Sequence, residues 1–256
     1  MTLHVNLKVM ICDHDFYGLH AINSYLAWDR RTRVVALTQT VNGIFEWLDR
    51  RADAEWPDTV LLDTEDIETA DELKAIIIRV RAKIPDVKVV VLEHLPRTDY
   101  ALAALEGRAV GYLVRNDVGL QIASTIAWLQ NVSFAISSSV EKVIKNKADK
   151  SLVNALVLPK QRPYPELTDR IRQAIQLCVV EGMSADLAAD EMGVSPHTIR
   201  SYIKEGYRIM EASDRNEYPA EMSAQERAFM RFTALDDSET HQFLPPDESD
   251  SPQPQD

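Results

Sequence analysis

Five short runs rich in Val, Ile and Leu alternate with segments of helical spacing through the first half of this 256-residue chain. Each run is typical of a buried strand, and the five cover residues 7–12, 33–37, 59–62, 88–92 and 109–114. Helical spacing is found in residues 17–28, 43–52, 70–84, 98–107 and 119–130. This alternation predicts an α/β fold whose parallel sheet is covered by helices on both faces. Because crossovers are right-handed, the simplest topology is a flavodoxin-like, doubly wound, five-stranded sheet.

The second half of the sequence has helical patterns only, and prolines separate it from the first half. Residues 137–150 predict one more helix, after which Pro159, Pro163 and Pro165 disfavour regular structure. Helical patterns then follow at residues 166–182, 184–193, 195–212 and 223–235. We therefore divide the chain into an α/β domain (1–133), a linker that contains a helix (134–165), an all-helical domain (166–235) and a tail (236–256).

Charge and composition exclude several classes of protein. The formal net charge of -12 argues against nonspecific binding to nucleic acid, which needs a basic surface. Seven acidic residues and no Lys or Arg lie from residue 236 onward, so the tail holds most of the surplus and is predicted to be disordered. We further predict that its deletion after Leu235 tightens DNA binding at low salt.

Membrane and metal sites are also not expected. No apolar run approaches the roughly 18 residues of a membrane span, and no basic segment precedes the first hydrophobic run, so we expect a cytoplasmic protein. The two cysteines, Cys12 and Cys178, lie in separate apolar runs and are predicted to be buried. No cluster of Cys and His residues predicts a metal site.

Four charged residues follow four of the predicted strands: Asp13, Asp63, Glu93 and Arg115. In open α/β sheets, ligands bind outside the carboxyl ends of the strands, where these side chains should converge. Charged residues also end strands that bind nothing. We favour a shared site because all four belong to the same edge of the sheet.

Residues 7–129 resemble a response-regulator receiver domain. The first-strand acidic site matches VMICDHD (9–15), the phosphoacceptor strand matches PDTVLLD (57–63), and ALAALEGRAVGYLVRND (101–117) matches the region before and through the last strand. The resemblance implies that Asp63 is the phosphorylation site, Asp13 a metal-binding acid and Tyr112 the aromatic switch residue.

The sequence departs from this family at three positions. Typical receivers have two adjacent acids after strand one, a Ser or Thr after strand four and a Lys after strand five, whereas this chain has Asp13-His14, Glu93 and Arg115. A carboxylate at Glu93 should repel a phosphoryl group by several kcal/mol, as an order of magnitude. Arg115 should instead pair with Asp63 or Glu93 and fill the pocket. We therefore expect no conventional phosphorylation and no cofactor, because Mg²⁺ belongs only to an active pocket.

Asp15 has two interpretations. It lies two residues after Asp13 and is a candidate replacement for the missing acid of the receiver pocket. It is also well placed to cap the helix that follows, and we favour this second role.

Helix-capping residues predict a helix–turn–helix between residues 184 and 210. Ser184 is suited to begin one helix, Gly193 to end it in a left-handed conformation, and Ser195 with Pro196 to begin the next. Helical spacing places Ile199, Ile203, Gly206 and Met210 on a stripe that should face the core, and His197, Arg200, Ser201, Lys204 and Arg208 on a separate polar and basic arc.

Residues 167–210 resemble the helix–turn–helix domain of LuxR/NarL-type regulators. The matching residues are Leu167, Thr168, Arg170, Gly182, Ser184, Leu187, Ala188, Gly193, Val194, Ser195, Thr198 and Ile199. The resemblance implies that His197, Thr198, Arg200, Ser201, Lys204 and Arg208 face DNA. The alternative is a solvated surface, because Glu211 lies on the same arc and residues 160–215 contain nine acidic against eight basic residues. We favour DNA binding because the caps, the turn and the basic arc coincide.

These patterns together predict a transcription regulator of a two-component system, with an atypical receiver that acts through dimerisation, a ligand or a regulatory protein partner. We expect a homodimer that reads two DNA half-sites and associates through the face formed by residues 98–130 or through the helix at 224–235. A conventional response regulator phosphorylated on Asp63 is one alternative, and a protein-interaction adaptor that does not bind DNA is another. No catalytic residues are predicted, because no nucleophile–base pair is recognisable, so we expect no enzyme.

Overall fold

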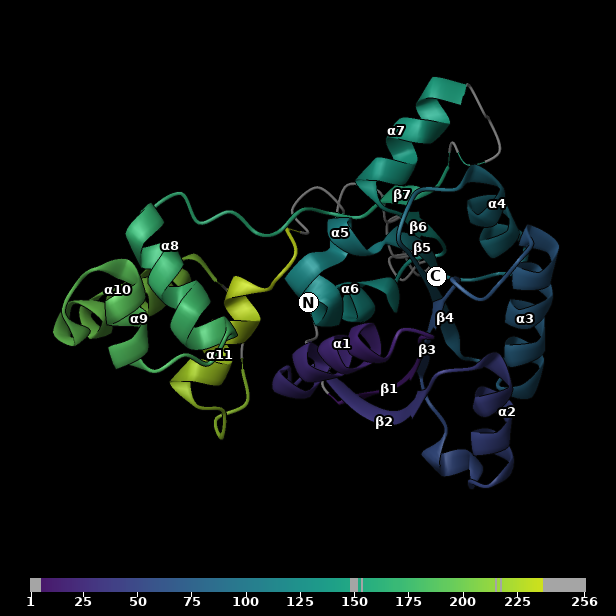
Figure 1. The fold of residues 1–256 in the computed structure, drawn as a ribbon, viewed down its shortest axis with the longest axis horizontal. Coiled ribbons are helices and arrows are strands. Elements are labelled where there is room, and N and C mark those ends of the chain that lie inside the picture. The colour runs from purple at the N-terminus through teal and green to yellow at the C-terminus, as the bar shows by residue number, and fades with distance from the viewer. Residues whose placement is uncertain (1–5, 148–151, 153, 215, 217, 237–256) are drawn as a thin grey trace, which may run out of the picture.

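The computed structural model describes residues 6–147, 152, 154–214, 216 and 218–236. Figure 1 shows an α/β domain, a smaller helical domain and the segment that connects them. The tail from residue 237 onward lies outside the described residues, so its predicted disorder stays a prediction.

The α/β domain contains one parallel sheet with the strand order β2-β1-β3-β4-β5-β6-β7. The strands are β1 (Leu7–Cys12), β2 (Thr32–Thr38), β3 (Thr59–Asp63), β4 (Lys88–Glu93), β5 (Gly111–Val114), β6 (Ala135–Ile136) and β7 (Leu156–Val157). The first five have the doubly wound order predicted from the sequence. The described chain has seven strands, however, where five were expected, because β6 and β7 extend the sheet beyond β5. These strands of two residues are too short to show a sequence period.

Helices cover both faces of this sheet. They are α1 (Phe16–Trp28), α2 (Val41–Asp49), α3 (Ala70–Lys83), α4 (Thr98–Glu106), α5 (Arg115–Val118), α6 (Ile122–Leu129) and α7 (Ser138–Lys147). Alternate strand residues face opposite sides, so Met10 and Leu62 pack under α2, α3 and α4, whereas Ile11 and Leu61 pack under α1 and α6. The two cores hold the strands in place and thus fix the carboxyl edge of the sheet.

The helix α7 connects the two added strands. Its Val140 and Ile144 are buried in the same core as Tyr100 of α4 and Tyr112 of β5. Residues assigned to the linker on sequence grounds therefore pack against the sheet, and α7 covers part of the α4 and β5 surface.

The helical domain consists of α8 (Asp169–Ile175), a π-helical turn (Gln176–Val180), α9 (Ala185–Met192), α10 (Pro196–Ser213) and α11 (Ala224–Phe232). The predicted caps are confirmed: Ser184 accepts a hydrogen bond from the Leu187 N–H, Ser195 accepts one from the Thr198 N–H, and Gly193 is left-handed with φ 65°. At Gly206 a side chain would lie 2.8 Å from Cδ1 of Ile175, so glycine permits the close approach of α10 to α8.

The C-terminal helix α11 is anchored in both domains. Its Phe229 and Met230 belong to the core of the helical domain, while Leu235, three residues after the helix, packs in the core under α1 and α6. Leu235 also pairs with Gln161 in an isolated antiparallel bridge. The Ser124 hydroxyl of α6 donates a hydrogen bond to the Thr233 carbonyl at 2.7 Å.

Arg31, beside β2, makes a second buried polar contact between the domains. Its guanidinium lies 2.6 Å from a carboxylate oxygen of Asp29, and both side chains are almost fully buried. The same guanidinium donates a hydrogen bond to the Met230 carbonyl of α11. Because a buried charge needs a complete set of partners, this contact fixes α11 against the α/β domain.

Candidate functional site

The carboxyl edge of the sheet brings together the four charged residues predicted from the sequence. Asp13 follows β1, Asp63 ends β3, Glu93 ends β4, and Arg115 begins α5 directly after β5. Asp13, Asp63 and Glu93 are buried, with exposed fractions of 1%, 7% and 5%. The structure divides the four residues into two separate ion-pair groups.

Arg115 holds two aspartates. Its Nη2 atom lies 2.6 Å from Oδ1 of Asp63 and 2.8 Å from Oδ2 of Asp13. The second oxygen of Asp63 accepts a hydrogen bond from the Glu65 N–H at 3.0 Å, and Oδ1 of Asp13 accepts one from the Asp15 N–H at 3.0 Å. The expected pairing of Arg115 with Asp63 is therefore present, and Asp13 is a second partner that the sequence did not predict.

The charges of this group perturb one another. Burial lowers the pKa of Arg115, but the negative charges of Asp63 and Asp13 outweigh burial and raise it overall. Burial and the charge of Asp63 raise the pKa of Asp13, while Arg115 acts in the opposite direction. The guanidinium thus stays charged, and the raised pKa of Asp13 makes its ionisation less favourable than that of a free aspartate.

Glu93 has a different cation, Arg97. The Nε atom of Arg97 donates to Oε2 of Glu93 at 2.9 Å, and the Thr64 hydroxyl donates to the same oxygen at 2.6 Å. The guanidinium also stacks over the Tyr100 ring at 3.4 Å from its centre. Sequence reasoning missed Arg97 and Thr64. The four-residue spacing of Glu93 and Arg97 was a weak signal, because it spans a strand end and a loop rather than one helix.

Tyr112 lies inward, with no exposed surface. Its hydroxyl accepts a hydrogen bond from the Arg97 N–H at 3.2 Å and lies 3.5 Å from Glu93. Burial and the charge of Glu93 raise the pKa of Tyr112. The aromatic residue that the family resemblance singles out is thus connected to the Glu93–Arg97 group.

Asp15 caps α1, which was the favoured of its two predicted roles. Its carboxylate accepts hydrogen bonds from the backbone N–H groups of Tyr17 and Gly18. A side chain at Gly18 would lie 2.9 Å from Nη1 of Arg115 and 2.9 Å from Asp15, so glycine leaves room for the guanidinium. The first turn of α1 therefore closes one side of the pocket.

The pocket does not suit the Mg²⁺ ion that an active receiver needs. Oδ2 of Asp13 is buried and accepts no well-oriented hydrogen bond, which is what a metal ligand would show. A guanidinium already lies beside this atom, however, and Asp15 is committed to capping. No group of three or more possible metal ligands occurs in the described part of the chain. A cation would therefore have to displace Arg115.

The exposed surface of α10 is the second candidate site. His197, Arg200, Ser201, Lys204 and Arg208 are exposed, and Thr198 is half-buried near the start of the helix. Ile199, Gly206 and Met210 on the other side are buried, as the sequence predicted, and Ile203 is half-buried. In Figure 1, α10 lies at the end of the helical domain away from the sheet. Its polar arc is accessible.

Acidic neighbours partly neutralise this arc. Nε and Nη2 of Arg208 donate hydrogen bonds to the carboxylate of Glu205, at 3.0 and 2.6 Å. Arg200 lies 4.0 Å from Asp186 of α9. Exposed pairs of this kind are weak and exchange readily with another anion. Arg200 and Lys204 remain the cations best placed to contact a ligand along α10.

Both surfaces expected to mediate dimerisation are used within the chain. The helix α7 packs against α4 and β5, and α11 buries Ala228, Phe229, Met230 and Phe232 in the core of the helical domain. Arg231 of α11 is buried in the same domain, 3.1 Å from Asp214, the residue that follows α10. Neither surface is fully free in the described residues.

None of the helices within the described ranges combines the length and apolar character that crossing a membrane requires.

Residues 165–210 match the family model of sigma-70 region 4, which covers the predicted helix–turn–helix. No curated protein sequence matches this chain.

Several solved response regulators are similar in structure. A form of RcsB from Salmonella typhimurium, described as showing conformational dynamism for DNA interaction, is 16% identical with a TM-score of 0.48 over 83% of this chain and 95% of that one. RcsB from Salmonella enterica serovar Typhimurium bound to promoter rprA is 17% identical with a TM-score of 0.45 over 88% and 98%. A response regulator from Thermotoga maritima is 23% identical with a TM-score of 0.42 over 49% and 98%.

Proposed function

We propose that this chain is a DNA-binding transcription regulator whose receiver-like domain is not switched by conventional phosphorylation. The position of Arg115 is the observation that argues against conventional phosphorylation. Its guanidinium lies between Asp63, the residue that would accept the phosphoryl group, and Asp13, the residue that would bind Mg²⁺. Transfer of a phosphoryl group needs a cation and hydrogen-bond donors directed at its oxygens.

Phosphorylation of Asp63 would have to break its ion pair with Arg115 and would then place a phosphoryl group near the negative charge of Glu93. Asp63 would lose its pairing partner, and the new phosphoryl charge would lie near a second carboxylate that already has its own cation, Arg97. We infer that the domain acts instead through dimerisation or through binding a ligand or protein partner.

Intact-mass measurement after treatment with acetyl phosphate and Mg²⁺ tests this proposal. The expected result is an unchanged mass for the native chain and for the Asp63→Asn variant alike. A substantial phosphorylated fraction in the native chain that is absent from Asp63→Asn would establish the conventional response regulator instead.

DNA binding is supported by the exposed arc of α10 together with the sigma-70 region 4 match of residues 165–210. A helix that follows a capped turn and exposes Arg and Lys side chains is suited to the major groove. One helix reads only a few base pairs, so we propose a homodimer on two half-sites. Selection of binding sites from random DNA, followed by gel-shift titration, tests this.

The competing function is a protein-interaction adaptor, and a specific observation favours it. Arg208 is paired with Glu205, and Arg200 lies near Asp186, so the arc has fewer free cations than its sequence suggests. If no DNA sequence is enriched in the selection and Arg200→Ala leaves all DNA affinities unchanged, the adaptor becomes the better assignment.

A further inference from the structure

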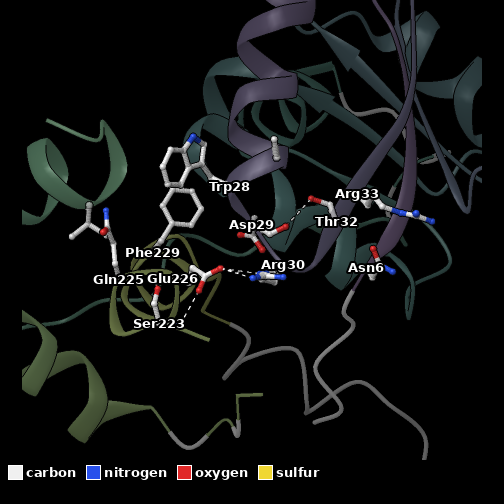
Figure 2. Close-up of a pocket in the computed structure, with 12 residues that line it drawn as sticks. Asn6, Trp28, Asp29, Arg30, Thr32, Arg33, Ser223, Gln225, Glu226 and Phe229 are labelled. Atoms are coloured by element: carbon white, nitrogen blue, oxygen red, sulfur yellow. Dashed lines mark hydrogen bonds and ion pairs between the residues drawn. The ribbon is translucent and has the colours of Figure 1, made fainter. Parts of the chain in front are cut away.

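A cavity of about 750 Å³ opens where α1 and β2 meet α11 (Figure 2). The α/β domain contributes Asn6, Trp28 and Arg33 to its wall, and the helical domain contributes Gln225, Glu226 and Phe229. Cavities of this size between two domains are common sites for small molecules. The cavity also lies beside Asp29 and Arg30, next to the buried contact that fixes α11.

One end of the cavity is aromatic. Trp28 has 58% of its surface exposed, and both Trp28 and Phe229 line the cavity (Figure 2). The helix that contains Trp28 has no charged residue in thirteen positions. An exposed indole on the wall of a cavity offers a flat apolar surface to a ring system.

The other end carries a surplus positive charge. Arg30 lies 2.8 Å from Glu226, and Asp29 lies 2.6 Å from Arg31, so each acidic residue of the wall already has a cation. Arg33 is exposed and makes no ion pair with the described residues. Figure 2 places Arg33 and Asn6 at the end opposite Trp28 and Phe229. The cavity therefore combines an aromatic surface with one available guanidinium.

We propose that this cavity binds a small aromatic anion, with its ring system against Trp28 and its acidic group at Arg33. A ligand held there contacts both domains at their joint and stabilises the arrangement in which α11 is docked. This inference deepens the proposed function, because it assigns the class of ligand that acts on the receiver-like domain of the regulator.

Fluorescence titration of the full chain with anilinonaphthalene sulfonate, a fused aromatic ring system with one sulfonate, tests the binding site. We expect saturable binding of one probe molecule per chain, with energy transfer from tryptophan. Arg33→Gln should weaken binding about fivefold, the upper range for an exposed ion pair. Trp28→Ala should weaken binding roughly tenfold and reduce the energy transfer.

Matched controls separate charge from general surface binding. Arg50→Gln removes the same charge at the end of α2, outside the cavity, and should leave the affinity unchanged. Phenylnaphthylamine, which has the rings but no sulfonate, should lose affinity in Trp28→Ala but not in Arg33→Gln. Equal affinities of Arg33→Gln and Arg50→Gln for the sulfonate, or binding of several probe molecules with no dependence on Trp28, would overturn the proposal.

The DNA-binding assignment can fail separately. Probe binding is measured without DNA, and Arg200→Ala should leave it unchanged. If the probe binds as expected while no DNA sequence is selected, the cavity assignment stands and the regulator assignment falls. If DNA binds and the probe does not depend on Arg33, only the cavity assignment falls.

Discussion

The guanidinium of Arg115 lies 2.6 Å from the carboxylate of Asp63, although the two residues are separated by 52 positions in the sequence. This ion pair lies at the carboxyl edge of the sheet, where a phosphoryl group would have to form. A half-buried guanidinium that is bonded to its own buried counter-ions is part of the folded state. The pocket therefore resembles a structural ion-pair centre more than an open site for chemistry.

Arg115→Ala should lower the free energy of unfolding by about 1–3 kcal/mol, because it leaves Asp13 and Asp63 buried without their cation. Urea unfolding measures the loss. Arg50→Ala removes an exposed arginine and should change the stability by less than about 0.5 kcal/mol. Adding Asp13→Asn to Arg115→Ala should recover part of the loss, since it removes one of the two unpaired charges. Equal stabilities of Arg115→Ala and Arg50→Ala would contradict the role given to Arg115.

Asp13→Asn alone should stabilise the chain at neutral pH. The pKa of Asp13 is raised in the folded state by burial and by Asp63, so ionised Asp13 opposes folding above that pKa. The advantage of the variant should shrink as the pH falls through the raised pKa toward about 4, the value for an unfolded aspartate. Urea unfolding over a pH series measures this difference.

Asp117→Asn is the control of opposite sign. Burial raises the pKa of Asp117, but hydrogen bonds from Ser139 outweigh burial and lower it overall. Ionised Asp117 thus contributes stability above its unfolded pKa, and this contribution is lost as the pH falls. Asp117→Asn should therefore destabilise the chain at neutral pH. If both variants shift stability in the same direction across the series, the assignment of Asp13 is wrong.

Arg200→Ala and Lys204→Ala should weaken DNA binding in different ways. If Arg200 reads a guanine, its loss should cost about 1–3 kcal/mol and relax the preference at one position of the selected site. Loss of a phosphate contact at Lys204 should weaken all sequences similarly and reduce the salt dependence by about one unit of slope. Gel-shift titrations at several salt concentrations distinguish the two, with Arg50→Ala as the control of equal charge.

Arg31→Ala should destabilise the chain far more than Arg30→Ala. Arg31 is buried with Asp29 and bonds α11, so its removal leaves a buried carboxylate and should cost roughly 3–5 kcal/mol. The neighbouring pair of Arg30 with Glu226 is exposed, and its loss should cost about 1 kcal/mol or less. Amide hydrogen exchange should show that α11 opens more readily in Arg31→Ala. Equal hydrogen-exchange rates in α11 of both variants would contradict the proposal that Arg31 holds this helix against the α/β domain.

Local rules explain what could be predicted from the sequence. The caps at Ser184 and Ser195 and the left-handed Gly193 depend on one or two neighbouring residues, so each is readable from its own segment. Each of the first five strands coincides with a short apolar run in the sequence. The convergence of Asp13, Asp63 and Arg115 follows from one rule about parallel sheets.

Features that depend on tertiary contacts could not be predicted in the same way. The strand β6 pairs with the edge of β5, and β7 pairs in turn with β6, so both depend on partners from outside their own segments. The partner of Glu93 is decided by where the loop before α4 directs Arg97, and no sequence spacing gives that direction. Likewise, the amphipathic pattern of α11 predicts a helix but not which of two domains it contacts.

The double anchoring of α11 determines where this chain can be divided. The prolines between residues 159 and 165 suggest a natural boundary, and a fragment that begins there would include the whole helix–turn–helix. Such a fragment would nevertheless leave Leu235 and the Met230 carbonyl without the surfaces that cover them. An exchange of domains between related chains would therefore have to transfer Asp29 and Arg31 together with the end of α11. The α/β domain and the helical domain can therefore be exchanged only together with these contacts, and α11 belongs structurally to both.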